Sequence, residues 1–295
     1  MSAVSAASVR ANQVARVAKD VRRVILYVVT ISLSLLFMFP FLWTVSSSLK
    51  TVGDILAYPP TLLPSVIQWQ NYLVAWEQAS FGIYAQNSVI VTSLSLIGTV
   101  SSSFFVAYGF ARFRFPLRGF LFTVVLSTML LPYEVTLIPI FLLFRTVGWV
   151  DTWLPLIVPS YFGGGAFNIF LFRQFIMTIP YELDEAALID GASRVRILWN
   201  IIVPSAKPAL ATVGVLAFIG AWNDFMGPLI FLNSQEKFTV SLGLYALRNY
   251  VGEPGEPKDH LLMAGAVMAT IPIVVLFFVA QKYFVQGIVT TGLKG

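Results

Sequence analysis

Cysteine is absent from this 295-residue chain, and histidine occurs once, as His260. The first absence excludes disulfides, thiolate metal sites and cysteine nucleophiles, and the second excludes a metal site built from several histidines. Charged side chains are also scarce: they make up 11% of the residues, whereas 57% are hydrophobic and the mean hydropathy is +0.80. These values indicate a protein that crosses a membrane several times, not a soluble domain with a buried core.

Two sequence patterns of catalysis are missing as well. No Gly-x-x-x-x-Gly-Lys-Ser/Thr loop is present to hold a nucleotide phosphate, and no Gly-x-Ser-x-Gly turn is present to carry a nucleophile. We therefore expect no catalytic residue, no metal and no cofactor bound by this chain. The net charge of +5 does not indicate nucleic-acid binding, because the lysines and arginines flank the apolar runs.

The apolar runs predict an all-α integral membrane protein with six spanning helices, since about 20 apolar residues are needed for a helix to cross the bilayer. A tail at 1–23 precedes this membrane domain of residues 24–281, and a short basic tail at 282–295 follows it. The run at 24–45 is too long for a signal peptide and lacks an Ala-x-Ala site, so it is expected to remain uncleaved. The predicted spans are 24–45, 81–110, 119–143, 153–177, 207–232 and 261–281.

Proline and glycine interrupt two of the predicted spans. Pro132 and Pro139 are expected to kink the third span, because proline removes a backbone hydrogen bond from a helix. Three successive glycines, Gly163 to Gly165, weaken the fourth span by roughly 1 kcal/mol each relative to alanine. Two explanations for the glycines stay open: a flexible point near a gate, or close packing of helices.

The distribution of lysine and arginine indicates the orientation, since both are enriched in cytoplasmic loops. With the N-terminus inside, 14 of the 19 lie on the cytoplasmic side and five lie outside. Both tails and the polar segment 180–204 are therefore expected in the cytoplasm. The loops at 46–80 and 233–260 are expected outside.

The polar segment 180–204 separates the fourth and fifth predicted spans and should face water. Pro180 is suited to start a helix, Gly191 should interrupt it, and Ser193 can cap a second short helix. Pro204 is expected to end this second helix. The acids of the segment are Glu182, Asp184, Glu185 and Asp190, and its arginines are Arg194 and Arg196. The apolar face expected on the second helix consists of Val195, Leu198, Trp199 and Ile202.

The spacing in this segment resembles a motif of ABC importers: Glu-Ala-Ala, three residues, Gly, nine residues, then Ile-x-Leu-Pro. In this chain the motif stands as Glu185-Ala186-Ala187, Gly191, Ile201 and Val203-Pro204, with valine in place of leucine. The similarity covers nearly the whole chain, including Trp222-Asn223-Asp224-Phe225 and the C-terminal Thr290-Thr291-Gly292-Leu293-Lys294-Gly295. The chain thus resembles the membrane permease subunits of binding-protein-dependent carbohydrate ABC importers. This resemblance implies the type I importer permease fold, with 180–204 as a cytoplasmic coupling helix–turn–helix between spans four and five.

The resemblance also implies partners and residue roles. The coupling helix–turn–helix would dock on a separate ATPase subunit, which would bind ATP and Mg²⁺ in place of this chain. Small residues would permit close docking, Glu185 would orient the segment, and Pro204 would help to tie it to the fifth span. The implied partners are two ATPase subunits, a second homologous permease, an extracytoplasmic solute-binding protein and the lipid of a prokaryotic cytoplasmic (inner) membrane. The implied coupling residues are Glu185, Ala186, Ala187, Asp190, Gly191, Ile201 and Pro204.

Three polar residues fall within predicted spans at similar depth: Glu134 in the third, and Asn223 and Asp224 in the fifth. Charge is costly in lipid, so these groups should face the bundle interior or a water-filled cavity. Trp222 beside an amide and a carboxylate would suit a sugar ring. Helix packing and helix capping are the alternatives to substrate contact for these four residues.

The sequence therefore predicts a transport subunit of an ATP-driven importer for a sugar or related polyol. A glycerol-phosphate substrate stays open, although no basic residue lies clearly at mid-depth in a span. An ion-coupled secondary transporter with Glu134 and Asp224 as proton sites is the main alternative, and it leaves the acidic coupling segment unexplained. A membrane enzyme is disfavoured because no nucleophile or metal cluster is apparent.

Overall fold

The computed structural model describes the backbone of residues 2–77, 80–250 and 258–292, and the side chains of 19–77, 80–247 and 258–281. Pro254 and Pro257 of the second outer loop, and the last three residues of the C-terminal pattern, lie outside the described residues. Within these ranges the regular elements are helical. The α-helices are α1 (Ser2–Ser48), α2 (Val52–Leu56), α3 (Gln70–Glu77), α4 (Phe81–Arg112), α5 (Arg118–Ser127), α6 (Tyr133–Thr146), α7 (Leu154–Ile157), α8 (Ala166–Thr178), α9 (Glu182–Ile189), α10 (Arg194–Ile197), α11 (Val203–Ser205), α12 (Lys207–Trp222), α13 (Met226–Phe231), α14 (Val240–Tyr250) and α15 (Asp259–Gly292). Shorter 3-10 turns lie at Thr128–Leu130, Val158–Tyr161 and Gln235–Lys237, and a π-helical turn lies at Leu198–Ile202.

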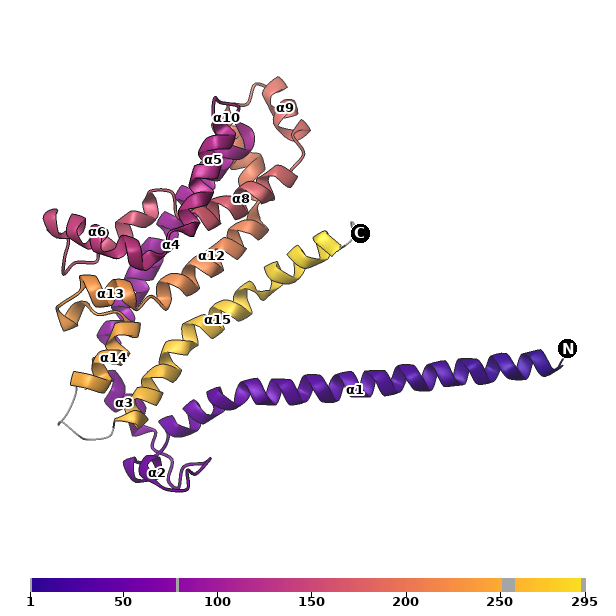
Figure 1. The fold of residues 1–295 in the computed structure, drawn as a ribbon, viewed down its shortest axis with the longest axis vertical. Helices are drawn as coiled ribbons and strands as arrows, with labels where there is room; N and C mark the ends of the chain where they lie inside the picture. Colours follow the sequence, from indigo (N-terminus) through magenta and orange to yellow (C-terminus); the bar gives the residue numbers. More distant parts are fainter. Residues whose placement is uncertain (1, 78–79, 251–257, 293–295) are drawn as a thin grey trace.

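Helix α4 connects the two ends of the molecule. It packs against α8 and α12, and it also contacts α3 and α14. The short helices α2, α3 and α14 gather at one end of the molecule, and α9 and α10 lie at the opposite end (Figure 1). Outer loops and the coupling segment were predicted on opposite sides of the membrane, and the fold places them at opposite ends.

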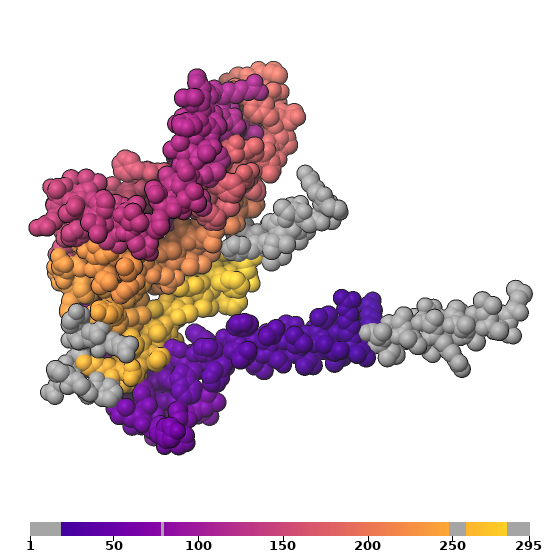
Figure 2. Space-filling view, in the orientation of Figure 1, coloured from indigo at the N-terminus to yellow at the C-terminus, as the bar shows by residue number. Residues whose placement is uncertain are grey.

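Helix α1 stands apart from the rest of the chain over most of its described length. It contacts α15 and projects away from the other helices (Figures 1 and 2). Its large apolar side chains are exposed from Val24 to Leu42, and Phe37 reaches 78% exposure. Such a surface is stable only against lipid or against another protein chain.

Membrane-spanning segments account for most of the described chain. Four helical segments are each long and apolar enough to cross a membrane. Two pairs of helices, each bent by more than 40°, also meet this test if each pair is counted as one span, so the described residues hold four to six spans. The chain is therefore an all-α integral membrane protein. The four candidate spans that are not bent pairs are Lys19–Ser48, Phe81–Arg112, Leu154–Thr178 and Asp259–Gln281. The bent pairs are Arg118–Leu130 with Tyr133–Thr146, and Arg194–Ser205 with Lys207–Trp222.

The third predicted span is two helices and not one continuous helix. A bend of 97° separates Arg118–Leu130 from Tyr133–Thr146. Pro132 lies at this bend, and Leu131 before it is extended at φ −80° and ψ 115°. Proline excludes the helical conformation of the preceding residue, which explains a break sharper than a kink. Pro139, by contrast, lies inside α6 and does not end it.

The three glycines interrupt the fourth predicted span, as expected from their low helix propensity. Gly163, Gly164 and Gly165 all have positive φ, at 99°, 62° and 90°. A side chain on Gly164 would overlap the backbone carbonyl oxygen of Thr99 on α4. Close packing against α4 therefore explains Gly164, which favours the second of the two explanations offered by the sequence.

The fifth and sixth predicted spans differ from the structure at their ends. Helix α12 stops at Trp222, and α13 starts again at Met226, so the predicted span 207–232 is broken near its polar residues. The predicted outer loop 233–260 contains the helix α14. The last helix, α15, continues to Gly292, so the predicted C-terminal tail is helical along its first part.

Two apolar cores hold the helices together. One lies toward the coupling segment, where Phe104 and Phe172 meet edge to face with ring centroids 5.1 Å apart. The other lies toward the opposite end and includes Tyr84 and Phe238, whose centroids are 6.3 Å apart. Both cores include residues of α4 and α12, so these two helices link one core to the other.

Candidate functional site

The coupling segment forms the predicted helix–turn–helix. α9 ends at Ile189, a turn follows with Gly191 at φ +78°, and α10 begins at Arg194. The hydroxyl of Ser193 accepts a hydrogen bond of 3.3 Å from the backbone N–H of Arg196, so Ser193 caps α10 as predicted. Local signals for a turn and a cap are sufficient to specify this part of the fold.

The two prolines of the segment lie one or two residues away from their predicted roles. α9 begins at Glu182 with Tyr181 as its first flanking residue, so Pro180 precedes the helix instead of opening it. Pro204 lies inside α11, and the helix ends only at Ser205. Because Pro204 has no N–H to donate to the preceding turn, the chain adopts a π-helical turn at Leu198–Ile202 just before it.

The apolar face predicted for the second helix is half right. Leu198 and Ile202 are buried, at 6% and 0% exposure, but Val195 and Trp199 are 65% and 54% exposed. Ile197, which was not predicted, is fully buried. The π-helical turn explains the difference, since its wider spacing brings residues five apart, Ile197 and Ile202, to the same side.

The residues predicted to couple the chain to an ATPase include an outer and an inner set. Glu185, Ala186 and Asp190 are exposed, and a side chain on Gly191 would meet nothing within 4 Å. Ala187 and Ile201 are half-buried and pack against the apolar core. The segment therefore presents an open outer face of acids and small residues, while its inner face anchors it to the membrane helices.

Asp184 is the acid of the segment that faces inward. Its side chain is fully buried, and Oδ2 lies 3.3 Å from Nε of Arg112 at the end of α4. Burial raises the pKa of the Asp184 carboxyl above its ordinary value, and the positive charges of Arg112 and Arg194 oppose this rise. The sequence gives no local signal for this pair, because its members are far apart in the chain.

Arg112 and its neighbour Tyr108 make further contacts with the segment. Nη2 of Arg112 donates a hydrogen bond of 2.9 Å to the carbonyl oxygen of Ile179, and its guanidinium lies 5.5 Å from the ring centroid of Tyr181. The hydroxyl of Tyr108 donates to the carbonyl oxygen of Arg194 at 3.3 Å. The last turn of α4 therefore holds both halves of the helix–turn–helix.

A cavity of about 580 Å³ lies within the helix bundle and is bounded by α4, α7, α8, α12 and α13. Asp224 lines it, as does Thr239, which is 5% exposed. The Thr239 hydroxyl has no hydrogen-bond partner among the described residues. That oxygen is itself buried, so it does not offer a hydrogen bond to a molecule in the cavity. The other polar residues of the lining are Ser95, Thr99, Ser160 and Asn168.

The four residues predicted for the substrate pathway lie in different environments in the structure. Asp224 lines the cavity, and its Oδ1 accepts a hydrogen bond of 3.1 Å from the N–H of Gly227. Asn223 is exposed and donates to the carbonyl oxygen of Ile219 at 3.0 Å, so it caps α12. Glu134 is exposed in the first turn of α6 and is not part of the cavity lining.

Trp222 is a packing residue in this structure. Its side chain is 4% exposed, and its Nε1 donates a hydrogen bond of 3.0 Å to the carbonyl oxygen of Ala269 on α15. Its ring stacks on Phe218 with centroids 5.7 Å apart. The predicted pairing of this aromatic face with Asn223 and Asp224 is therefore absent from this conformation, because the indole points into the helix packing.

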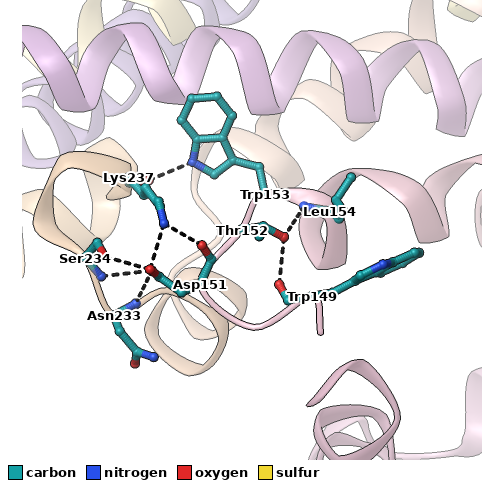
Figure 3. Close-up of polar contacts among 8 residues, drawn as sticks. All are labelled: Trp149, Asp151, Thr152, Trp153, Leu154, Asn233, Ser234 and Lys237. Carbon is teal, nitrogen blue, oxygen red and sulfur yellow. Dashed lines mark hydrogen bonds and ion pairs between the residues drawn. The ribbon is translucent and has the colours of Figure 1, made fainter. Parts of the chain in front are cut away.

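At the other end of the molecule, a polar network joins two connecting segments (Figure 3). The Asp151 carboxylate accepts hydrogen bonds from the backbone N–H groups of Asn233 and Ser234, at 3.0 and 2.9 Å, and from the ammonium of Lys237 at 2.7 Å. Trp153 donates through Nε1 to the carbonyl oxygen of Lys237 at 2.9 Å. These contacts hold the turn before α7 against the segment before α14.

Comparisons with known proteins place this architecture among transporters. Residues 100–290 match the family model described as binding-protein-dependent transport system inner membrane component. The chain is 35% identical over 257 residues to the probable ABC transporter permease protein YurM of Bacillus subtilis, covering 87% of this chain and 84% of YurM. It is 32% identical over 281 residues to the arabinooligosaccharides transport system permease protein AraQ of the same species, covering 94% and 97%.

Two further relatives extend the comparison. The sn-glycerol-3-phosphate transport system permease protein UgpE of Yersinia enterocolitica is 33% identical over 263 residues, covering 86% of this chain and 92% of UgpE. Among solved structures, a bacterial ABC transporter involved in the import of the acidic polysaccharide alginate matches with a TM-score of 0.80 and 25% identity, covering 90% of this chain and 98% of that one.

Proposed function

The chain belongs to the binding-protein-dependent transport system inner membrane component family, as a permease subunit of an ABC transporter, and we propose that it couples import of a sugar or polyol to ATP hydrolysis on a partner. The single observation that carries this proposal is the coupling segment. It has an exposed face of small and acidic residues, and an inner face fixed to the membrane helices by Arg112 and Asp184. A segment arranged in this way can bind a partner subunit on its outer face and transmit that subunit's movement to the membrane helices.

In the proposed mechanism, ATP binding closes a pair of ATPase subunits and draws the coupling segments of two permeases together. The membrane helices then open outward and accept substrate from the binding protein, and hydrolysis returns them to the inward-facing state. Ala186, Ala187 and Gly191 would allow close contact with the ATPase, and Glu185 and Asp190 would supply charge on the same face. Ile201 and Pro204 would link the segment to α12.

The cavity supports a neutral, hydroxyl-rich substrate. Its lining contains hydroxyl and amide groups together with the carboxylate of Asp224, and no lysine or arginine is among the lining residues of the described chain. An anionic substrate would meet repulsion from a carboxylate and no compensating positive charge. AraQ transports arabinooligosaccharides by name, which favours a sugar. The name of UgpE keeps glycerol phosphate as the second candidate.

The proposed assembly follows from the family. A second homologous permease would complete the pathway and cover the apolar face of α1, two ATPase subunits carrying ATP and Mg²⁺ would bind the coupling segments, and a solute-binding protein would dock outside. The membrane domain 24–281 would lie in a prokaryotic cytoplasmic (inner) membrane, with the tails 1–23 and 282–295 and the segment 180–204 in the cytoplasm.

The test uses the complete complex, purified with its own ATPase and binding protein and reconstituted in liposomes. ATP hydrolysis is measured while neutral sugars, polyols and glycerol phosphates are added with the binding protein. Stimulation by one class supports the proposal and identifies the substrate class. If no ATPase co-purifies and uptake stops with a proton uncoupler, the ion-coupled alternative replaces it.

A further inference from the structure

The coupling segment is covalently joined to the membrane domain only at its two ends. α8 leads into it through Ile179, and α12 follows it after Ala206. Helix α4 is remote in the sequence, yet its last residue, Arg112, contacts the beginning of the segment. This contact connects the coupling segment to the membrane domain through a charged side chain, in addition to the Tyr108 hydrogen bond and the apolar packing described above.

The guanidinium of Arg112 makes two contacts at the beginning of the segment. Its Nε lies 3.3 Å from Oδ2 of Asp184, and its Nη2 donates a hydrogen bond of 2.9 Å to the carbonyl oxygen of Ile179. The side chains of Arg112 and Asp184 are 4% and 0% exposed. The guanidinium therefore connects the end of α4 to α9 by an ion pair, and to the residue just before the segment by a hydrogen bond.

The other acids of the segment are placed differently. Glu182, Glu185 and Asp190 are exposed, and only Asp184 faces inward. The same end of α4 also holds α10, because the Tyr108 hydroxyl donates to the carbonyl oxygen of Arg194. Arg194 in turn acts electrostatically on Asp184. The end of α4 therefore contacts α9 through Asp184 and α10 through the carbonyl oxygen of Arg194.

Helix α4 then leads from this point to the cavity. It is 32 residues long and continuous, and Val91, Ser95 and Thr99 of the same helix line the cavity. Because a packed helix moves nearly as a rigid body, a displacement of Arg112 shifts these three residues as well. Helices α8 and α12, which adjoin the covalent ends of the segment, also line the cavity, so α4 provides an additional route to it.

We propose that Arg112 and Asp184 are positioning residues that transmit movement of the coupling segment to α4 and, through α4, to the cavity. This inference rests on the proposed function, because it assumes that an ATPase moves α9. The pair acts at a distance from both ATP and substrate. Its loss should therefore leave binding of both intact and lower the amount of substrate moved per ATP.

The experiment compares variants of the complete complex in liposomes. Arg112→Gln removes the charge, Arg112→Lys keeps it, and Arg114→Gln is the matched control, since Arg114 is exposed two residues further along. We expect Arg112→Gln to co-purify with the ATPase and to hydrolyse ATP, but to transport about tenfold less substrate per ATP. Arg112→Lys should recover only part of the lost coupling, because an ammonium can keep the ion pair but not also the hydrogen bond to Ile179. Arg114→Gln should match the wild type.

Two outcomes overturn the inference at this step. One is a normal ratio of transport to hydrolysis in Arg112→Gln. The other is an equal loss in Arg114→Gln, which would show that total positive charge at this end of α4 matters and the pair does not.

A second variant keeps the test decisive if Arg112→Gln fails to assemble, because one buried charge without its partner destabilises a protein. The double variant Arg112→Met with Asp184→Leu removes both charges and should restore assembly while coupling stays low. Two results would show that the pair serves folding only. The double variant could couple normally, or it could fail to assemble. If the wild-type complex itself shows no hydrolysis that responds to the loaded binding protein, the proposed function fails, independently of these variants.

Discussion

The ammonium nitrogen of Lys237 lies 2.7 Å from Oδ2 of Asp151, although 86 residues separate the two in sequence. The same ammonium also donates to the backbone carbonyl oxygen of Asp151. Asp151 has a positive φ of 60°, which aspartate tolerates better than most residues. One acidic residue thus fixes the turn before α7 against the segment before α14 (Figure 3).

Asp151→Asn should destabilise this connection. Asparagine tolerates the same backbone conformation, so the substitution removes the charge without adding strain. We expect the free energy of unfolding to fall by about 1 to 2 kcal/mol, a value limited by partial exposure of the ion pair. Thermal unfolding of the purified chain in detergent measures the change. Glu236→Gln, an exposed acid in the same segment, is the control and should have no effect.

The Asp151 carboxylate also predicts how the stability difference between the wild type and Asp151→Asn depends on pH. Hydrogen bonds from Lys237 and Ser234 hold the pKa of Asp151 well below its ordinary value of 3.8. A lowered pKa in the folded state contributes stability that is complete above the unfolded value and is lost as pH falls through the folded value. The difference between wild type and Asp151→Asn should therefore be constant from neutral pH to about pH 5 and shrink only in stronger acid. A difference that varies between pH 6 and pH 8 would assign the effect to another group.

Gly191→Asp should uncouple hydrolysis from uptake without preventing membrane insertion. Gly191 has φ +78° and open space around its Cβ position, and aspartate is one of the residues that accept this conformation. The added bulk and charge therefore act on the docked ATPase and not on the chain itself. Gly191→Asn adds similar bulk without charge and separates the two effects. Wild-type uptake per ATP in Gly191→Asp contradicts the proposed docking face.

Gly164→Ala should be far more disruptive than Gly148→Ala. Both glycines have positive φ, at 62° and 73°, so both substitutions carry a backbone strain of about 1–2 kcal/mol. Only at Gly164 would the new side chain also overlap α4, which adds roughly 1–3 kcal/mol for overpacking. The yield of folded protein and its unfolding temperature in detergent measure the contrast. Equal effects would contradict the close contact between Gly164 and α4.

Asp224→Asn should lower transport, and Glu134→Gln should not. Asparagine keeps an oxygen to accept from Gly227, so α13 remains capped, but the cavity loses a charged acceptor. A lost hydrogen bond to a charged group costs about 1.5–3 kcal/mol, which corresponds to a transport rate at least about tenfold lower. Uptake of the identified substrate at fixed ATP is the measurement. A loss in Glu134→Gln of the same size would place the pathway elsewhere.

Local sequence signals predicted the helix–turn–helix backbone of residues 180–204 well. Gly191 and Ser193 act on their immediate neighbours, so a turn and a cap could be inferred without knowing the rest of the fold. The π-helical turn before Pro204 could not, because it depends on how the chain accommodates a missing N–H within a packed helix. That turn alone changed which apolar residues are buried, placing Ile197 inward and Trp199 outward.

Long-range pairs could not be predicted from one sequence. Arg112 contributed to the prediction of orientation only as a positive charge, and nothing in its neighbourhood indicates Asp184 as its partner. Trp222 was assigned to the substrate pathway because polar residues follow it, yet its indole bonds to Ala269 on the last helix. In both cases, the role depends on which helix lies opposite, and this is decided by packing.

The bend at Pro132 has a consequence for the bilayer around this subunit. α5 has ten residues and continues into the three-residue 3-10 turn Thr128–Leu130, so the segment before the bend is about 20 Å long, shorter than the hydrocarbon thickness of about 30 Å. The chain then turns by 97°, and Leu130 and Leu131 at the turn are 81% and 59% exposed. Backbone carbonyls at an open helix end cannot face acyl chains. Fatty tails must therefore be kept away from this surface, and either a neighbouring polypeptide or a column of water must occupy the gap.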